Sequence, residues 1–314
     1  MTSVQTAAGA VLPKRRDYLR PWHGVLNVLH VIGNHALLLL WFWLGHRLLP
    51  LAAFLPLSLL FSLAHQRAMS EWIHEGAHYN LVPGRTWNDR WANLTAGSFF
   101  GVPVASYRAV HFAHHGKHDF FVEEDPDTYF LTVGTKREFR RGVLHDLTGL
   151  TLLSQFRRFR AADSTRAEQV WRALTVVLHA GLLTLAVWTG RIEAALVYYG
   201  SLAVAYPLLN RLRTYAQHVT IEPTGQSRVA GSATSRTVDA GLLDRLILDS
   251  ARLLYHHEHH QYPHLPYRAL KQLVTDTDDV NAYSRSRTAV LRAVYRGLPD
   301  TAVPAPAPST VAVR

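Results

Sequence analysis

Eight histidines of this 314-residue chain fall into three short clusters with related spacing. Two clusters read His-x-x-His-His and one reads His-x-x-x-His. On a helix, positions i, i+3 and i+4 share one face, so each cluster can aim two or three imidazoles at a common point. Imidazole suits iron, zinc and copper, and eight nitrogens are too many for one ion, so the pattern indicates two metal ions. The eight candidates are His74, His78, His111, His114, His115, His256, His259 and His260.

The order of the clusters resembles the three histidine boxes of the integral-membrane fatty acid desaturase superfamily, which also contains hydroxylases and ketolases. The flanking residues are similar too. Tyr107-Arg108 leads into the second box, Glu124-Asp125-Pro126-Asp127 follows it, and Gln261-Tyr262-Pro263-His264-Leu265-Pro266-Tyr267 follows the third. The resemblance covers roughly residues 20–275.

This resemblance implies a ninth metal ligand, His218, just after the last membrane helix. It also implies two non-haem iron ions, O2 as co-substrate, and desaturation of a fatty acyl chain linked to a lipid, coenzyme A or a carrier protein. Removing hydrogen from an unactivated methylene needs a strong oxidant and a dry passage that holds the chain near the metals. The acidic residues near the boxes are candidates for orienting the histidines, although each could instead be a solvated surface charge. They are Glu75, Asp125, Asp127 and Glu258.

Electrons must come from a separate protein, because the chain has no cysteine and therefore no iron–sulfur cluster of its own. A His-Pro-Gly-Gly segment, which would indicate a fused cytochrome b5 domain, does not occur in the sequence. We expect a donor of the ferredoxin or cytochrome type, with its reductase. One departure from the family lies shortly before the third box, where an asparagine is often found and this chain reads Asp249-Ser250-Ala251-Arg252-Leu253-Leu254.

Three other functions are compatible with parts of the pattern. Hydroxylases and ketolases of hydrophobic substrates use the same boxes, so substrate placement decides the product. The segment His74-Glu75-Gly76-Ala77-His78 also matches the zinc-protease motif His-Glu-x-x-His. A membrane protease of that kind leaves the second and third boxes unexplained. A non-catalytic metal-binding membrane protein is the remaining alternative.

Four apolar runs predict the elements that position the boxes. Two helical hairpins, each long enough to cross a bilayer, predict an all-α integral membrane fold with a cytosolic helical cap that carries the boxes. The stretch 95–105 is predicted to be interfacial or re-entrant, and 219–241 to be loop. A basic segment (1–20), a single domain (21–300) and a disordered tail (301–314) make up the chain. The predicted spans are about 24–45, 51–72, 170–189 and 192–212.

The charge balance is strongly basic, with 33 Lys and Arg against 23 Asp and Glu. No nucleic-acid motif accompanies it, so anionic membrane lipids are the expected partner. Only Arg47 and Arg191 lie at the far ends of the hairpins. The positive-inside rule therefore predicts that both termini and all boxes are cytosolic. Scarce lysine and abundant arginine indicate a bacterial protein, placed in the cytoplasmic membrane.

Overall fold

The first predicted hairpin forms from two long helices that meet at a short turn. α2 ends at Leu48 and α3 begins at Leu51, and Pro50 occupies the N-cap position of α3 with an extended backbone. The computed structural model describes residues 14–115, 134–154, 165–229, 235–247, 254–274 and 277–300. Its first elements are α1 (Arg15–Tyr18), α2 (Pro21–Leu48) and α3 (Leu51–Ala77).

The second hairpin turns at Gly190, whose φ of +65° lies in the left-handed region that glycine adopts without a steric cost. Its returning arm is one continuous helical run that passes through a π-helical segment and ends at His218. His218 is therefore the last residue of a helix and does not follow it. The hairpin consists of α10 (Arg166–Trp188), α11 (Ile192–Gly200), η2 (Ser201–Ala205) and α12 (Tyr206–His218).

Three helical runs are long and apolar enough to cross a membrane within the described residues, namely 21–48, 166–188 and 192–218. α3 is not among them, because His65, Gln66, Arg67 and Glu71 follow its apolar first half. The chain is mostly helical, as predicted. The four-span arrangement stays a prediction, since α3 reaches the length of a span but not its composition.

Two π-helical segments interrupt the helical runs: η1 (Asn93–Gly97) lies between α4 (Arg85–Ala92) and α5 (Ser98–Phe100), and η2 lies in the run that ends at His218. Polar side chains of the first hairpin satisfy carbonyls beside both segments. His35 Nε2 donates to the Thr95 carbonyl at 2.7 Å, and Gln66 Nε2 donates to the Tyr198 carbonyl at 2.9 Å. With its Nε2 donating, neutral His35 accepts at Nδ1 from His65 Nε2, 2.8 Å away. These polar residues therefore serve the backbone of their neighbours.

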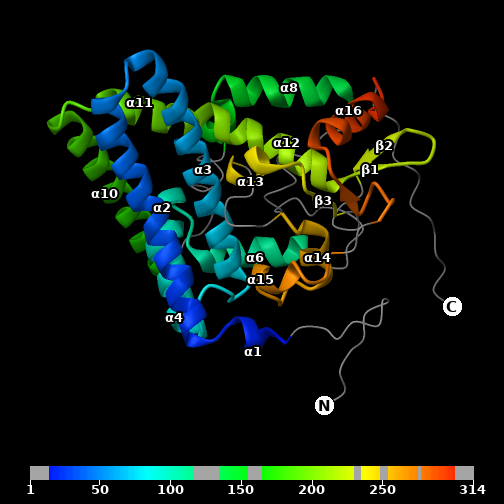
Figure 1. The fold of residues 1–314 in the computed structure, drawn as a ribbon, viewed down its shortest axis with the longest axis horizontal. Helices are drawn as coiled ribbons and strands as arrows, with labels where there is room; N and C mark the ends of the chain where they lie inside the picture. The colour runs from blue at the N-terminus through cyan, green and yellow to red at the C-terminus, as the bar shows by residue number, and fades with distance from the viewer. Residues whose placement is uncertain are drawn as a thin grey trace.

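The cap is built from shorter elements, most of which lie to the right of the long helices in Figure 1, whereas α4 (Arg85–Ala92) lies beside the lower end of α2. The predicted re-entrant stretch consists of η1, α5 and the start of α6. The prediction of an all-α chain needs a correction, because two small sheets pair β1 with β2 and β3 with β4 in the region expected to be loop and after it. The cap comprises α4 (Arg85–Ala92), α5 (Ser98–Phe100), α6 (Val104–His114), α8 (Lys136–Leu147), β1 (Val219–Ile221), β2 (Ser227–Val229), β3 (Thr237–Val238), α13 (Leu242–Ile247), α14 (His256–Gln261), α15 (Tyr267–Leu270), β4 (Tyr283–Ser284) and α16 (Arg287–Gly297).

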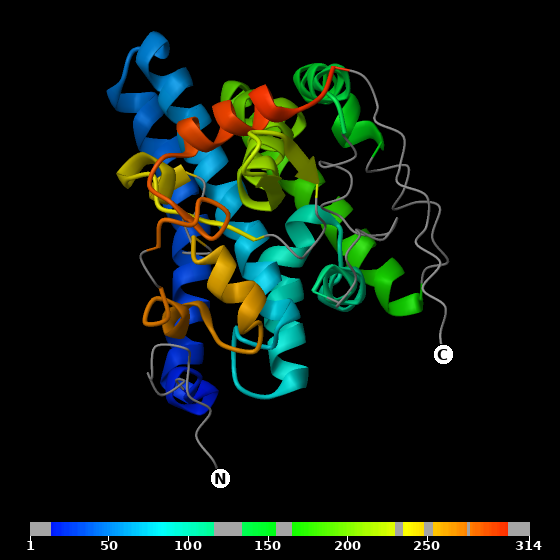
Figure 2. The same cartoon turned by 90° about the vertical axis from the view of Figure 1, so that its right-hand side faces the viewer.

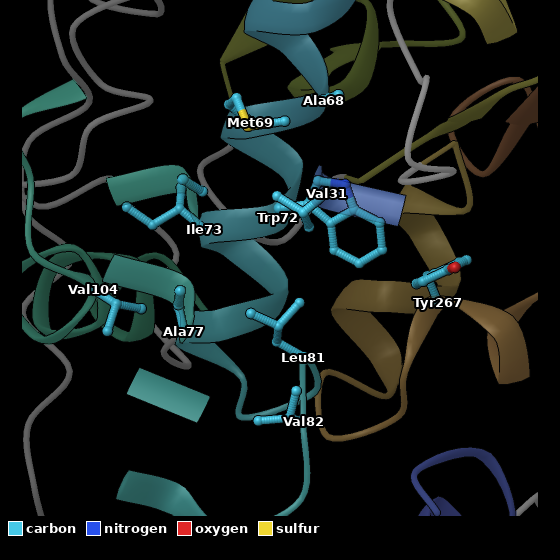
Figure 3. Packing of buried hydrophobic residues seen from close by; sticks show 12 residues of the cluster. Val31, Ala68, Met69, Trp72, Ile73, Ala77, Leu81, Val82, Val104 and Tyr267 are labelled. Atoms are coloured by element: carbon cyan, nitrogen blue, oxygen red, sulfur yellow. The ribbon is translucent and has the colours of Figure 1, made fainter. Parts of the chain in front are cut away.

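One apolar cluster joins the first hairpin to the cap around Trp72 (Figure 3). Trp72 is fully buried, and its ring meets Tyr267 of α15 edge-on at 5.9 Å between centroids. A glycine allows the closest approach within this cluster. A Cβ on Gly76 of α3 would lie 2.5 Å from the Cβ of Ala92 of α4. The first histidine box is thus fixed against both α4 and α15.

Candidate metal centre

Five of the predicted ligands meet in one buried cluster, hereafter the first cluster. Each offers one ring nitrogen, and these nitrogens all lie within 4.8 Å of one another. The Nε2 atoms form a chain in which His78 is 2.9 Å from His111, His111 is 3.0 Å from His115, and His115 is 2.9 Å from His259. The first cluster contains His74, His78, His111, His115 and His259.

The other four predicted ligands form the second cluster. His114, His218 and His260 bring their ring nitrogens within 4.8 Å of one another. His256 joins them, because its Nε2 lies 2.8 Å from Nε2 of His218. The two clusters are neighbours, with 4.5 Å between the ring centroids of His115 and His260. All nine histidines predicted from the sequence therefore meet in two adjacent groups.

The second and third boxes each divide between the two clusters. In the second box, His111 and His115 join the first cluster and His114 the second. In the third box, His259 joins the first cluster, whereas His256 and His260 join the second. The sequence-based idea that each box aims at a single point is therefore wrong for these two boxes. In both boxes the histidines at positions i and i+4 join the same cluster, and the histidine at i+3 joins the other cluster.

The spacing of the nitrogens fits metal ions better than hydrogen bonds. His111 Nε2 lies about equally close to Nε2 of His78 and of His115. One ring nitrogen carries either a hydrogen or a lone pair, so it cannot pair properly with both. Ligands at right angles on an ion with bonds of about 2.1 Å are roughly 3.0 Å apart. His260 Nε2 is also buried and has no hydrogen-bond partner within the described residues.

Burial keeps these imidazoles neutral, which is the form that binds metal. Loss of solvation, together with the nearby Arg108 cation, lowers the pKa of His78 to about 3. Burial and the neighbouring His78 lower the pKa of His115 to about 2. The site therefore presents lone pairs, and its chemistry suits a metal whose positive charge replaces the missing protons.

Glu75 is an acidic candidate whose carboxylate lies near a predicted ligand. Its Oε2 accepts a long hydrogen bond, 3.4 Å, from the backbone N–H of Tyr267, and Oε1 lies 3.9 Å from Nδ1 of His74. Neither Oε1 nor that Nδ1 has a hydrogen-bond partner within the described part of the chain. Burial raises the pKa of Glu75 to about 8. A small shift of either side chain would make Glu75 the acceptor that fixes the tautomer of His74.

Glu258 anchors the third box to a strand. The Thr237 hydroxyl of β3 donates to Glu258 Oε2 at 2.5 Å, and the backbone N–H of His257 donates to the same hydroxyl at 3.1 Å. The His257 ring lies outside both clusters, with Nδ1 2.9 Å from the Ser235 carbonyl. Asp125 and Asp127, the remaining acidic candidates, lie outside the described residues.

Two arginines hold the boxes together, and sequence reasoning did not assign either role. Arg108 of α6 donates to the Ala77 carbonyl at 2.7 Å at the end of α3, which links the first box to the second. Arg236 is fully buried and donates to the carbonyls of Ala216 and Val219, on either side of His218. The position of Arg108 shortly before the second box was a sequence signal for its role. Arg236 carried no local signal, since its partners are distant in sequence.

Comparison with known proteins agrees with this geometry. No curated protein matches the sequence. The family model described as fatty acid desaturase matches residues 48–287, a range that includes both clusters. Because the match covers most of the chain and the candidate membrane helices accompany it, the protein belongs to the fatty acid desaturase family.

Proposed function

We propose that this protein desaturates a fatty acyl chain with O2 at a centre of two iron ions. The observation that carries the proposal is the convergence of nine histidines in two adjacent clusters, in a chain of the desaturase family. Neutral imidazoles hold the metal without adding negative charge, and the paired clusters suit two ions. Membership of the family supports a hydrophobic acyl substrate. Assays with lipid-linked, coenzyme A-linked and carrier-protein-linked chains would identify the linkage.

The residues of the chain have distinct tasks in this proposal. The first cluster would hold one ion and the second cluster the other, and the ions would supply the activation of O2 with two external electrons. Glu75 would orient His74, Glu258 would fix the third box, and the buried surroundings would exclude water. Asp125 and Asp127 remain candidates for the same orienting role at the second box.

We further propose four spans in two hairpins, with α3 crossing the membrane beside α2. Contact at the far tips supports this arrangement. His46 at the end of α2 lies 2.6 Å from Glu193 at the start of α11, and Arg191 contacts His46. The two hairpin tips therefore lie on one side, and the histidine clusters lie at the opposite ends of the helices. The boxes and both termini would then be cytosolic.

The electron donor would be a separate ferredoxin or cytochrome, kept reduced by its own reductase. The chain has no cysteine that could bind an iron–sulfur cluster. Hydroxylation or ketolation of a lipid would use the same site and the same donor. A zinc protease finds less support, because five histidines meet around the His-Glu-x-x-His segment where such an enzyme uses two of its histidines and one further ligand.

Product analysis tests the proposal directly. Lipids from cells that express the wild-type protein or His111→Ala should be compared by mass spectrometry under 18O2. Desaturation gives products two hydrogens lighter and free of 18O, found only with wild type. Incorporated 18O would indicate a hydroxylase or ketolase instead.

Metal content tests the centre independently. Protein purified aerobically in detergent should contain about two metal ions, and iron should restore activity to the metal-free form. Proteolysis that depends on zinc, without oxygen consumption, would overturn the proposed function.

A further inference from the structure

A groove on the outer surface lies next to the first histidine box and plays no part in the proposed reaction. It runs between the start of α2, the segment after the first box and α4, and it encloses about 430 Å³. Figures 1 and 2 show the start of α2 at the lower end of the molecule, and Figure 1 places α4 beside it. The lining includes Gly24, Val25, Val28, Pro83, Trp87 and Trp91.

The floor of the groove depends on close packing at Gly24. A Cβ at this position would lie 2.8 Å from Cδ of Pro83 and 3.2 Å from Cβ of Val82. Pro83 follows the first box by five residues. The groove therefore borders the segment that leads from the metal ligands to α4, and its volume falls in the range of ordinary ligand sites.

The groove opens beside exposed apolar residues of α2. Val25 is 59% exposed and Leu29 is 57% exposed, on a helix that is long and apolar enough to span a bilayer. Trp87 on α4 is likewise 59% exposed. Tryptophan is enriched at the level of lipid head groups, so α4 has the composition of an interfacial helix. An apolar groove at this level is a site for a hydrocarbon chain.

Positive charge borders the same groove. The guanidinium carbon of Arg90 lies 5.1 Å from the centroid of the Trp87 ring. Arg20 directly precedes Pro21, which lines the groove, and its side chain is 59% exposed, with Asp17 3.9 Å away. Asp89, the other nearby carboxylate, pairs with Arg108 instead. Arg90 and Arg20 therefore complement an anionic head group above the apolar groove.

We propose that this groove binds an anionic membrane phospholipid, with one acyl chain along Val25, Val28 and Trp91 and the phosphate near Arg90. The site is distinct from the proposed active site, since its lining residues belong to neither histidine cluster. Bound lipid would hold α2 against α4 beside the first box. The occupant is a lipid of the surrounding bilayer, and it is not consumed.

Native mass spectrometry of the full chain in mild detergent tests binding. With phosphatidylglycerol and phosphatidylcholine of equal chain length, we expect one retained lipid and a several-fold preference for phosphatidylglycerol. Arg90→Gln should reduce that preference towards parity while a lipid adduct remains. Equal retention of the two lipids by wild type would overturn the assignment of an anionic head group.

A matched pair of variants locates the site. Val25→Trp should fill the groove and remove the adduct, whereas Val176→Trp on α10, at a position 68% exposed and outside the groove, should retain it. Retention by both variants would overturn the proposal. Elution volume and metal content should match wild type in both.

Photolabelling of the wild-type chain needs no variant. A phosphatidylglycerol with a photoreactive acyl chain should label peptides within 21–29 or 82–91. Labels found only elsewhere would contradict the proposal. Labelling there by a photoreactive free fatty acid but not by the phospholipid would assign the groove to a single-chain ligand and would also overturn it.

Discussion

At the scale of single residues, geometry separates the predicted ligands from other nearby histidines. His111 Nε2 lies within 3.0 Å of two other ring nitrogens, whereas His257 faces the Ser235 carbonyl. The His-x-x-His-His spacing of the third box predicted that His257 is not a ligand. The division of the second and third boxes between the two clusters was beyond the sequence, because it depends on how distant parts of the chain meet.

The ligand assignment predicts different losses at His111, His259 and His257. His111→Ala or His259→Ala should lower turnover on the order of 100-fold or more and reduce bound metal, because losing even an orienting partner of a ligand typically costs 10–100-fold. Expression should persist, since the hairpins pack through apolar contacts. His257→Ala should be milder. Turnover and metal analysis of the three variants checks this, and equal losses would mean that the ligands are misassigned.

Gln217 offers a second test at this scale. Its side chain is fully buried, and neither amide atom has a hydrogen-bond partner within the described residues. An unsatisfied buried amide costs about 1–3 kcal/mol, so Gln217→Leu should raise the thermal midpoint of the detergent-solubilised protein. Asn27→Leu is the control and should lower it, because Asn27 Nδ2 donates to the Leu81 carbonyl at 2.8 Å. A lower midpoint for Gln217→Leu would indicate a hydrogen-bonded water or ligand at the amide.

At the scale of elements, the apolar runs of the sequence predicted the two hairpins. They did not predict the π-helical segments that interrupt the helices. The turns near Pro50 and Gly190 have clear sequence signals, and the structure has them there. The π-helical segments have none, because the partners of their neighbouring carbonyls, His35 and Gln66, come from other helices. The same reason explains why the small sheets were missed. Strands of two or three residues gain their stability from pairing across the chain and show no alternation long enough to detect.

The packing of α3 against α4 yields a prediction about glycine. In Gly76→Ala the new methyl would meet Ala92, so the change should lower stability by about 1–3 kcal/mol and shift the first box. Gly33→Ala in α2 is the matched control. Apart from the adjoining backbone of α2, no atom of the protein lies within 4 Å of its added Cβ, so the variant should be stabilised by about 0.5–1 kcal/mol. Thermal midpoints and metal content measure both changes. Equal stability of the two variants would contradict the packing argument.

At the scale of the whole molecule, charge and apolar surface predict how the protein lies in the membrane. Arg47 and Arg191 are the only basic residues at the far tips of the proposed hairpins, so the positive-inside rule predicts that the remaining basic residues lie on the cytosolic side. Reporter tags on the two termini should therefore read as cytosolic in bacterial cells. Modification of a cysteine introduced at Arg47 by an impermeant reagent should succeed from outside. Termini that read as periplasmic would reverse the proposed topology.

We expect the basic residues of α8 and α16 to form the docking surface for the proposed electron donor. α8 and α16 lie along one edge of the cap (Figure 1), and Arg140 Nε donates to the hydroxyl of Tyr295 at 2.7 Å between them. Arg137, Arg141 and Arg292 are exposed on these helices. A basic surface of this kind accelerates encounter with an acidic carrier.

Turnover with a purified acidic ferredoxin should fall as salt rises, because salt screens charges beyond about 8 Å at physiological ionic strength. Metal content should stay constant over the same range. Combined Arg137→Gln and Arg141→Gln changes should raise the KM for the donor at low salt and converge with wild type at high salt. Arg47→Gln, at the far tip, should leave that KM unchanged. Donor kinetics independent of salt would remove the docking surface while leaving the metal centre untouched, since the histidine clusters are buried and neutral.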